Sequence, residues 1–206
     1  MVLGAAAIAA VLDWIAVARR PNRVERVAKP LTLVLLIAFA VALSPDDAGQ
    51  RAWFVVALMC SLAGDLLLLP SVDRFVPGLA AFLVAHVAYI IGFVVGGIVL
   101  AAIPVAAVLV ALVAIPLGRR LVAGARASGD EAVIAPVVVY VFVIATMVVA
   151  ALADADRVAV AGALLFMSSD ALIGWTRFVR SIRWAPVTIM VSYHVGQALI
   201  VLSLVT

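Results

Sequence analysis

The sequence is divided into eight apolar stretches by short segments that contain charged residues, proline or glycine. A helix that crosses the hydrocarbon core of a bilayer needs about 20 apolar residues, and most of the stretches approach this length. The pattern therefore predicts an all-α fold, a polytopic bundle of eight transmembrane helices with short loops. The predicted spans are residues 2–18, 31–44, 52–69, 78–97, 100–117, 132–153, 158–178 and 186–205.

Composition agrees with a membrane protein and excludes a water-soluble domain. Of the 206 residues, 68% are apolar and 12% are charged, whereas soluble domains are nearer half apolar and a quarter charged. Because the eight spans occupy almost all of the sequence, residues 1–206 are expected to form a single transmembrane domain. The lone cysteine, Cys60, excludes an internal disulfide and a cysteine-based zinc cluster.

Charge alternates from loop to loop. The first, third, fifth and seventh loops hold twelve of the fourteen basic residues, including Arg19, Arg20, Arg23, Arg26 and Lys29 in the first loop. Basic residues mark the cytoplasmic side, so both termini are expected outside, in a bacterial cytoplasmic membrane. The net charge of +3 is explained by membrane orientation, and no nucleic-acid partner is expected.

Three features recur at similar intervals along the chain. Pro30 and Pro136 are 106 residues apart, Asp65 and Asp170 are 105 apart, and His86 and His194 are 108 apart. These offsets indicate two duplicated halves, residues 1–99 and 100–206. Since each half has four spans, the repeats would be parallel.

Five aspartate and histidine side chains lie within the apolar stretches, where an ionised group costs about 2.5–3.5 kcal/mol even on the insertion scale. They are Asp13, Asp65, His86, Asp170 and His194. Helix rise puts the last four in one layer of the cytoplasmic half of the membrane. We therefore expect spans 3, 4, 7 and 8 to surround one cavity in which the two aspartates face each other. Asp13 is expected to be structural and to reach toward the interface.

Other polar residues share faces with this layer. Tyr89 is three residues after His86, Gln197 is three after His194, and Tyr193 flanks the second pair. Each can be a site residue or a helix–helix contact. Lys29, beside Pro30 at a span entrance, can bind a lipid phosphate with the first-loop arginines or anchor the helix.

Five motifs, in order along the chain, resemble those of the YhhN, or lysoplasmalogenase-like, integral membrane family. They are Lys29-Pro30, Gly64-Asp65, His86 with Tyr89, Ser169-Asp170, and Tyr193 with Gln197. The resemblance extends from about residue 28 to 202. It departs at Gly196, where the family pattern has alanine, and at His194, which the pattern lacks.

The resemblance implies cleavage of the vinyl ether bond of a lysoplasmalogen to a fatty aldehyde and a glycerophospho-base. It maps the family's two acidic motif residues to Asp65 and Asp170. Vinyl ether hydrolysis begins with protonation of carbon and gives an oxocarbenium-like cation. One carboxylic acid can donate that proton while a second carboxylate stabilises the cation or activates water, as in glycoside hydrolysis.

These observations predict a membrane hydrolase with Asp65 and Asp170 as catalytic residues. The substrate-binding residues are expected to be Lys29, His86, Tyr89, Ser169, Tyr193 and Gln197. The expected partners are a lysophospholipid substrate and membrane lipid, with no cofactor and no obligate protein partner.

Two other functions fit the same residues. One is a metal-dependent lipid hydrolase with His86, His194, Asp65 and Asp170 as ligands. The other is a small-molecule or lipid transporter in which the repeats move around the buried acids.

Overall fold

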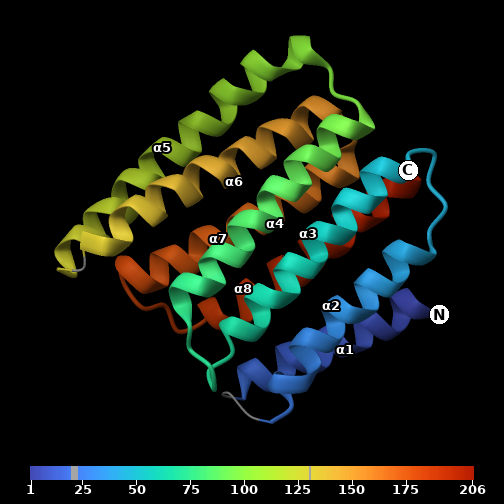
Figure 1. Cartoon of the computed structure of the whole chain (residues 1–206). Helices are drawn as coiled ribbons and strands as arrows, with labels where there is room; N and C mark the ends of the chain where they lie inside the picture. The colour runs from blue at the N-terminus through green and yellow to red at the C-terminus, as the bar shows by residue number, and fades with distance from the viewer. Residues whose placement is uncertain (20–22, 130) are drawn as a thin grey trace.

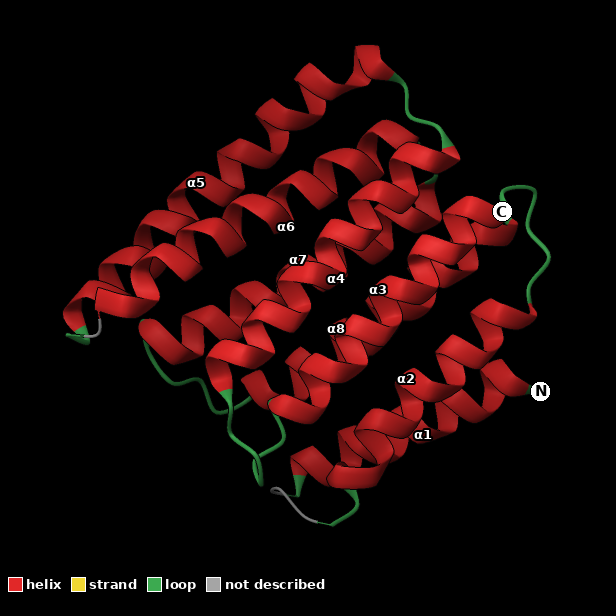
Figure 2. Cartoon of the chain, viewed as in Figure 1, coloured by secondary structure: helices red, strands yellow, loops and turns green. Residues whose placement is uncertain are grey.

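The computed structural model describes residues 1–19, 23–129 and 131–206, and its regular elements are all helical (Figure 2). Eight α-helices lie within these ranges: α1 (Val2–Ala18), α2 (Glu25–Ala42), α3 (Ala48–Leu67), α4 (Phe75–Gly96), α5 (Ile103–Ala127), α6 (Ile134–Asp154), α7 (Arg157–Phe178) and α8 (Ala185–Leu202). Single turns of 3₁₀ helix precede α5 and α6 and follow α8. The all-α prediction is confirmed.

Six of the eight helices, α3 to α8, are long and apolar enough to cross a bilayer. α1 is apolar but has 17 residues. α2 begins with the charged residues Glu25, Arg26 and Lys29, which lower the hydropathy of its first turns. The sequence therefore predicted the number of helices correctly, while length and composition support six of them as membrane spans.

Two predicted spans differ from their helices by more than four residues at one end. α2 begins at Glu25 instead of residue 31 and contains Pro30, and α5 continues through Pro116 to Ala127 instead of ending at residue 117. A proline removes one backbone donor, and packing on both sides can keep the helix intact. The last turns of α5 carry arginines whose side chains can extend toward water.

The contacts between helices form a closed ring with two helices outside it. Along the ring each helix contacts the next in the order α2, α3, α4, α6, α7, α8, and α8 contacts α2. α1 packs on α2 and α8, and α5 packs on α6 and α7. Figure 1 shows the two chain ends on the same side of the bundle, as an even number of crossings requires.

The interior of the ring is filled by aromatic side chains and a few polar ones. Phe54, Tyr89, Phe93 and Phe166 are fully buried. The ring of Phe54 meets those of Tyr89 and Phe93 edge to face, with centroids 5.3 and 5.1 Å apart. This arrangement suits aromatic pairs because the positive edge of one ring meets the negative face of the other.

Two glycines let α7 and α8 come into backbone contact. A Cβ atom on Gly162 would lie 2.8 Å from the carbonyl oxygen of Gly196, and one on Gly196 would lie 2.9 Å from the carbonyl oxygen of Gly162. Small residues are the usual means of close helix packing in membranes. Glycine at position 196, where the resemblance leads one to expect alanine, is thus required by this chain's own packing.

We predict that Gly196→Ala lowers stability by about 1–3 kcal/mol, because the added methyl group collides with backbone that cannot rotate away. Gly4→Ala is the matched control, since a Cβ there meets nothing within 4 Å and alanine favours a helix by about 1 kcal/mol. Thermal unfolding in detergent, followed by circular dichroism, measures both. Equal melting temperatures for the two variants would contradict the close contact.

Candidate active site

The predicted site residues are all buried, and most of them form three hydrogen-bonded groups that join different helices. None of these side chains is more than 9% exposed; they are Lys29, Asp65, His86, Tyr89, Ser169, Asp170, Tyr193, His194 and Gln197. Buried polar groups need partners, and these side chains find them across the ring. Their partners decide which chemistry each residue can support.

The first group surrounds Asp65 on α3. The ammonium of Lys29 on α2 lies 3.2 Å from Asp65 Oδ1, and the Tyr193 hydroxyl on α8 donates to Asp65 Oδ2 at 2.8 Å. A carboxylate with a cation on one oxygen and a hydroxyl donor on the other is held as an anion in a fixed orientation.

Lys29 therefore faces the protein interior, because the buried Asp65 carboxylate requires a cation. Lys29 is only 6% exposed, so a lipid phosphate would have to compete with Asp65 for it. Arg20, expected to assist Lys29 in phosphate binding, lies outside the described residues, whereas Arg23 and Arg26 are exposed.

The second group surrounds Asp170 on α7. The Tyr140 hydroxyl on α6 donates to Asp170 Oδ2, and His86 Nε2 on α4 lies 3.4 Å from the same oxygen. The other ring nitrogen, His86 Nδ1, lies 2.6 Å from the carbonyl oxygen of Phe82. A carbonyl can only accept, so Nδ1 carries hydrogen and the neutral ring presents the Nε2 lone pair to Asp170.

The third group links three helices and holds no ionisable acid. Tyr89 donates to Gln197 Oε1, and Gln197 Nε2 donates to Ser61 Oγ at 3.0 Å. Ser169 donates separately to the carbonyl oxygen of Ile189 on α8, at 3.2 Å. For Tyr89 and Gln197 the sequence allowed either substrate binding or a contact between helices, and these bonds are contacts between helices.

Aromatic rings lie between the two aspartate groups. Phe166 has its ring centroid 5.4 Å from that of Tyr193, the partner of Asp65, and 4.6 Å from that of His86, the neighbour of Asp170. Phe82 also contacts the Tyr193 and Phe166 rings. The two carboxyl groups remain near enough to interact electrostatically.

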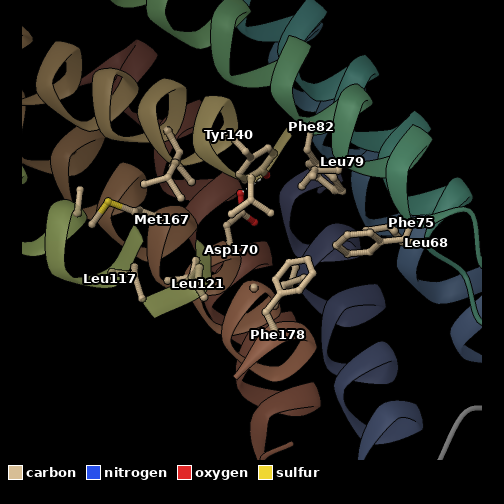
Figure 3. A pocket seen from close by; sticks show the side chains of 17 residues that line it. Leu68, Phe75, Leu79, Phe82, Leu117, Leu121, Tyr140, Met167, Asp170 and Phe178 are labelled. Carbon is tan, nitrogen blue, oxygen red and sulfur yellow. Dashed lines mark hydrogen bonds between the residues drawn. The ribbon is translucent and has the colours of Figure 1, made fainter. Parts of the chain in front are cut away.

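An apolar cavity of about 50 Å³ borders Asp170 but not Asp65 (Figure 3). Its wall is built from α4, α5, α6 and α7 together with Leu68, and Asp170 and Tyr140 are its polar lining residues. This cavity is therefore not the one expected between spans 3, 4, 7 and 8, because Asp65 and α8 do not line it. The physical reason is that Phe82 and Phe166 fill the space on the α8 side.

The mouth of this cavity carries aromatic rings and an arginine. Phe75 at the start of α4 and Phe178 at the end of α7 both line it, and their ring centroids are 6.0 Å apart. The guanidinium of Arg177 lies 4.8 Å from the centre of the Phe75 ring. A cation thus stands beside the mouth, about two helical turns along α7 from Asp170.

His194 and Asp13 lie on the other side of the ring, toward α1. Trp14 Nε1 on α1 donates to His194 Nδ1 at 3.1 Å. Asp13 was expected to reach the interface, but it is fully buried on the face of α1 that packs against the bundle, and neither carboxyl oxygen has a hydrogen-bond partner. Lys29 and Asp65 are within its electrostatic range.

The four residues of the alternative metal site are not brought together in the described part of the chain. No three side chains of histidine, cysteine, aspartate or glutamate come together there in an arrangement that could hold a metal ion. His194 is bonded to Trp14, Asp65 is paired with Lys29, and only His86 and Asp170 approach each other.

Sequence reasoning missed two residues of these groups, Tyr140 and Trp14. The sequence signal for Tyr140 was that the chain has only three tyrosines. In the structure all three donate hydrogen bonds within the groups. Trp14 gave no comparable signal, since its role depends on α1 packing against α8.

The fold and its buried groups define a polytopic helical membrane protein with two carboxyl-centred polar groups inside its bundle. The chain belongs to the YhhN family, whose model matches residues 24–204. It is 32% identical to lysoplasmalogenase TMEM86B of Homo sapiens over 176 residues, which cover 85% of this chain and 73% of the human protein.

Two further relatives carry similar names. Lysoplasmalogenase TMEM86B of Mus musculus is 28% identical over 93% of this chain and 80% of its own length. The lysoplasmalogenase of Mycobacterium tuberculosis is 34% identical over 81% of this chain and 65% of its own length. No solved structure matches this fold.

We predict that Lys29→Met lowers stability by about 3–5 kcal/mol, because it leaves the Asp65 carboxylate buried without its cation. Adding Asp65→Asn should restore most of the loss, since an apolar side chain and a neutral amide need no charge compensation. Chemical denaturation in micelles measures the single and double variants. A double variant no more stable than Lys29→Met would contradict an energetic coupling of the pair.

Proposed function

We propose that this protein is a lysoplasmalogenase-like hydrolase that cleaves the vinyl ether bond of a lysophospholipid to a fatty aldehyde and a glycerophospho-base. One observation carries the proposal: the carboxyl group of Asp170 stands in the wall of an apolar cavity, with Tyr140 and His86 on one of its oxygens. Kinship to proteins named lysoplasmalogenase supports the substrate class.

In the first step Asp170 donates a proton to the alkenyl carbon that is not bonded to oxygen. Tyr140 and His86 both lie at Oδ2, so Oδ1 is the carboxyl oxygen left free to face the alkenyl carbon. The apolar cavity holds the alkenyl group against it and keeps bulk water away. Protonation leaves an oxocarbenium-like cation at the carbon bonded to oxygen.

Asp65 supplies negative charge for that cation from the neighbouring group. It is the aspartate with an ammonium at ion-pair distance, so it is the one held as an anion. Because aromatic rings separate it from the cavity, it acts through space and through the Tyr193 hydroxyl. This division of roles between a donor and an anionic carboxylate parallels that in glycoside hydrolysis.

Water then adds to the cation, and the hemiacetal breaks down to aldehyde and alcohol. His86 is suited to accept the proton that water loses, because its Nδ1 hydrogen is engaged by the Phe82 carbonyl and its Nε2 has no hydrogen-bond partner. From Nε2 the proton can return to Asp170, 3.4 Å away, which restores the donor.

The substrate would enter with its chain in the cavity and its phosphate at the mouth. A cavity of about 50 Å³ has room for only a few waters, so the lining side chains must move to admit the chain. At the mouth Arg177 is the cation beside the aromatic rings. It therefore suits a headgroup phosphate better than Lys29, which is paired with Asp65.

We expect Asp170→Asn to lower kcat by about 10²–10⁴-fold, the range typical of general acid–base groups. Asp65→Asn should also lower kcat, and it is assayed together with Lys29→Met so that no buried charge is left unpaired. Asparagine keeps the size of the side chain but cannot donate a carboxylic proton or carry the negative charge. The measurement is aldehyde release from an alkenyl lysophosphoethanolamine by purified protein in micelles, followed by mass spectrometry.

Two controls and one binding-site variant make this measurement specific. Asp46→Asn changes an exposed acid of the α2–α3 loop and should leave turnover unchanged. The matching alkyl lysolipid lacks the double bond that accepts the proton and should give no aldehyde. Arg177→Gln should raise KM more than it lowers kcat, because phosphate binding is similar in the ground and transition states. Full turnover in folded Asp170→Asn protein would refute the mechanism.

We further infer that all eight helices cross the membrane, with the odd-numbered loops in the cytoplasm and both termini outside. The support is the concentration of basic residues in those loops and the position of both termini on one side of the bundle. The buried ion pair with α3 compensates the charge of Lys29 on α2.

Cysteine labelling in a Cys60→Ser background tests this orientation. Asp46 and Ser181 are both exposed, in the loops before α3 and before α8. A membrane-impermeant maleimide should label Asp46→Cys in intact cells and Ser181→Cys only after permeabilisation. The reverse pattern would invert the topology.

A further inference from the structure

A groove of about 750 Å³ lies between α5 and α6, at the edge of the bundle. Residues of α5 between 107 and 126 and of α6 between 138 and 149 line it. Two of them, Ile115 and Phe142, are 52% and 70% exposed, so the groove opens toward the surroundings of the bundle. Small-molecule sites have volumes of about 300–1,000 Å³. The groove is therefore large enough to hold a lipid chain as it stands.

The apolar part of the groove is about as long as the lipid chains of one leaflet. On α5 the lining residues from Ala107 to Gly118 are all alanine, valine, isoleucine or glycine. An α-helix rises about 16 Å over this interval, and half of a hydrocarbon core of about 30 Å is about 15 Å. On α6 the hydroxyl of Thr146 donates to the carbonyl oxygen of Phe142. A hydrocarbon chain therefore meets an apolar surface along this part of the groove.

Two arginines line the groove toward the end of α5, which is cytoplasmic in the topology proposed above. Arg119 directly follows the apolar part, and Arg126 lies two helical turns further along the same side of α5. Both are exposed, and within the described chain neither forms a salt bridge with an acidic side chain. Basic pockets between membrane helices on the cytoplasmic side suit anionic lipid headgroups. This end of the groove therefore complements a headgroup with a net negative charge.

We propose that the groove binds an anionic phospholipid of the surrounding membrane, with an acyl chain between α5 and α6 and its phosphate at Arg119 and Arg126. A zwitterionic lipid suits the groove less, because its ammonium would meet the two guanidinium groups. A second copy of this chain would bury both arginines and would have to supply acidic side chains to compensate them. The lipid site does not depend on the proposed hydrolase activity.

The proposed lipid would also contact the wall of the cavity beside Asp170. Ala114 and Val141 line that cavity as well as the groove. An acyl chain between α5 and α6 would therefore pack against the outer side of these two residues.

Native mass spectrometry of the purified protein in detergent measures this binding, with dioleoyl phosphatidylglycerol and dioleoyl phosphatidylcholine as the probes. The two lipids have the same chains and differ in headgroup charge. We expect the first phosphatidylglycerol to bind at about 25-fold lower concentration than the first phosphatidylcholine, because each arginine near an anionic headgroup contributes about fivefold.

Arg119→Gln together with Arg126→Gln should abolish this preference, and both changes are at exposed positions that the fold does not require. The matched control is Arg180→Gln together with Arg183→Gln. It removes the same charge from exposed positions before α8 that do not line the groove, so it should keep the preference.

A second pair of variants tests the apolar part of the groove. Ala111→Phe places a ring between α5 and α6 and should weaken the binding of both lipids. Leu112→Phe makes a similar change at the next residue, which is 68% exposed and outside the groove, and it should alter neither.

Equal binding of the two lipids by the unmodified protein, or a preference that survives the loss of Arg119 and Arg126, would overturn the inference. Loss of the preference in the Arg180 and Arg183 control as well would show a general attraction to the basic side and would refute a specific site. A dimer that Ala111→Phe dissociates would also overturn the inference, because the groove would then be an interface between two copies.

Discussion

The ion pair of Lys29 and Asp65 is the interaction on which the arrangement of this bundle depends. Inside a bilayer an isolated charge is expensive, so the two helices that carry these residues must stay together. The pair lies 3.2 Å apart and nearly out of contact with solvent, and Tyr193 extends it to α8. Three helices, the consecutive α2 and α3 and the distant α8, are thereby fixed around one carboxylate.

The same requirement explains why the polar groups connect the two halves of the chain. Asp65 on α3 binds a partner on α8, Asp170 on α7 approaches a residue on α4, and Tyr89 on α4 bonds Gln197 on α8. Helices α3 and α7, and α4 and α8, hold matching places in the two halves. We propose that this exchange of partners reflects duplicated halves related by an approximate two-fold axis along the membrane normal.

The residues that could be identified from the sequence are those whose ionisable side chains are costly to place inside a bilayer. Asp65, His86, Asp170 and His194 stand out among apolar neighbours, and the structure buries all four. What could not be predicted is pairing, because helix periodicity gives the face of a residue but not the helix opposite it. Tyr140 illustrates this, since its partner Asp170 is 30 residues away on another helix.

Boundaries and cavities escaped prediction for a related reason. The charged residues before Pro30 and after Pro116 look like span ends in the sequence, yet α2 and α5 include them. The separation of the two aspartates depends on the rings of Phe82 and Phe166. Nothing in the spacing of apolar residues distinguishes a ring that fills such a gap from one that faces lipid.

The position of Lys29 also bears on how the protein is made. α2 is the helix whose first turns carry charge, and the counter-charge that makes it compatible with the bilayer belongs to α3. During synthesis α2 leaves the ribosome before that partner does. In the eight-span topology proposed above, stable insertion of α2 therefore waits for α3. The two helices then enter the membrane as a hairpin, which buries the Asp65 carboxylate and sets the N-terminal part of the topology in the same event.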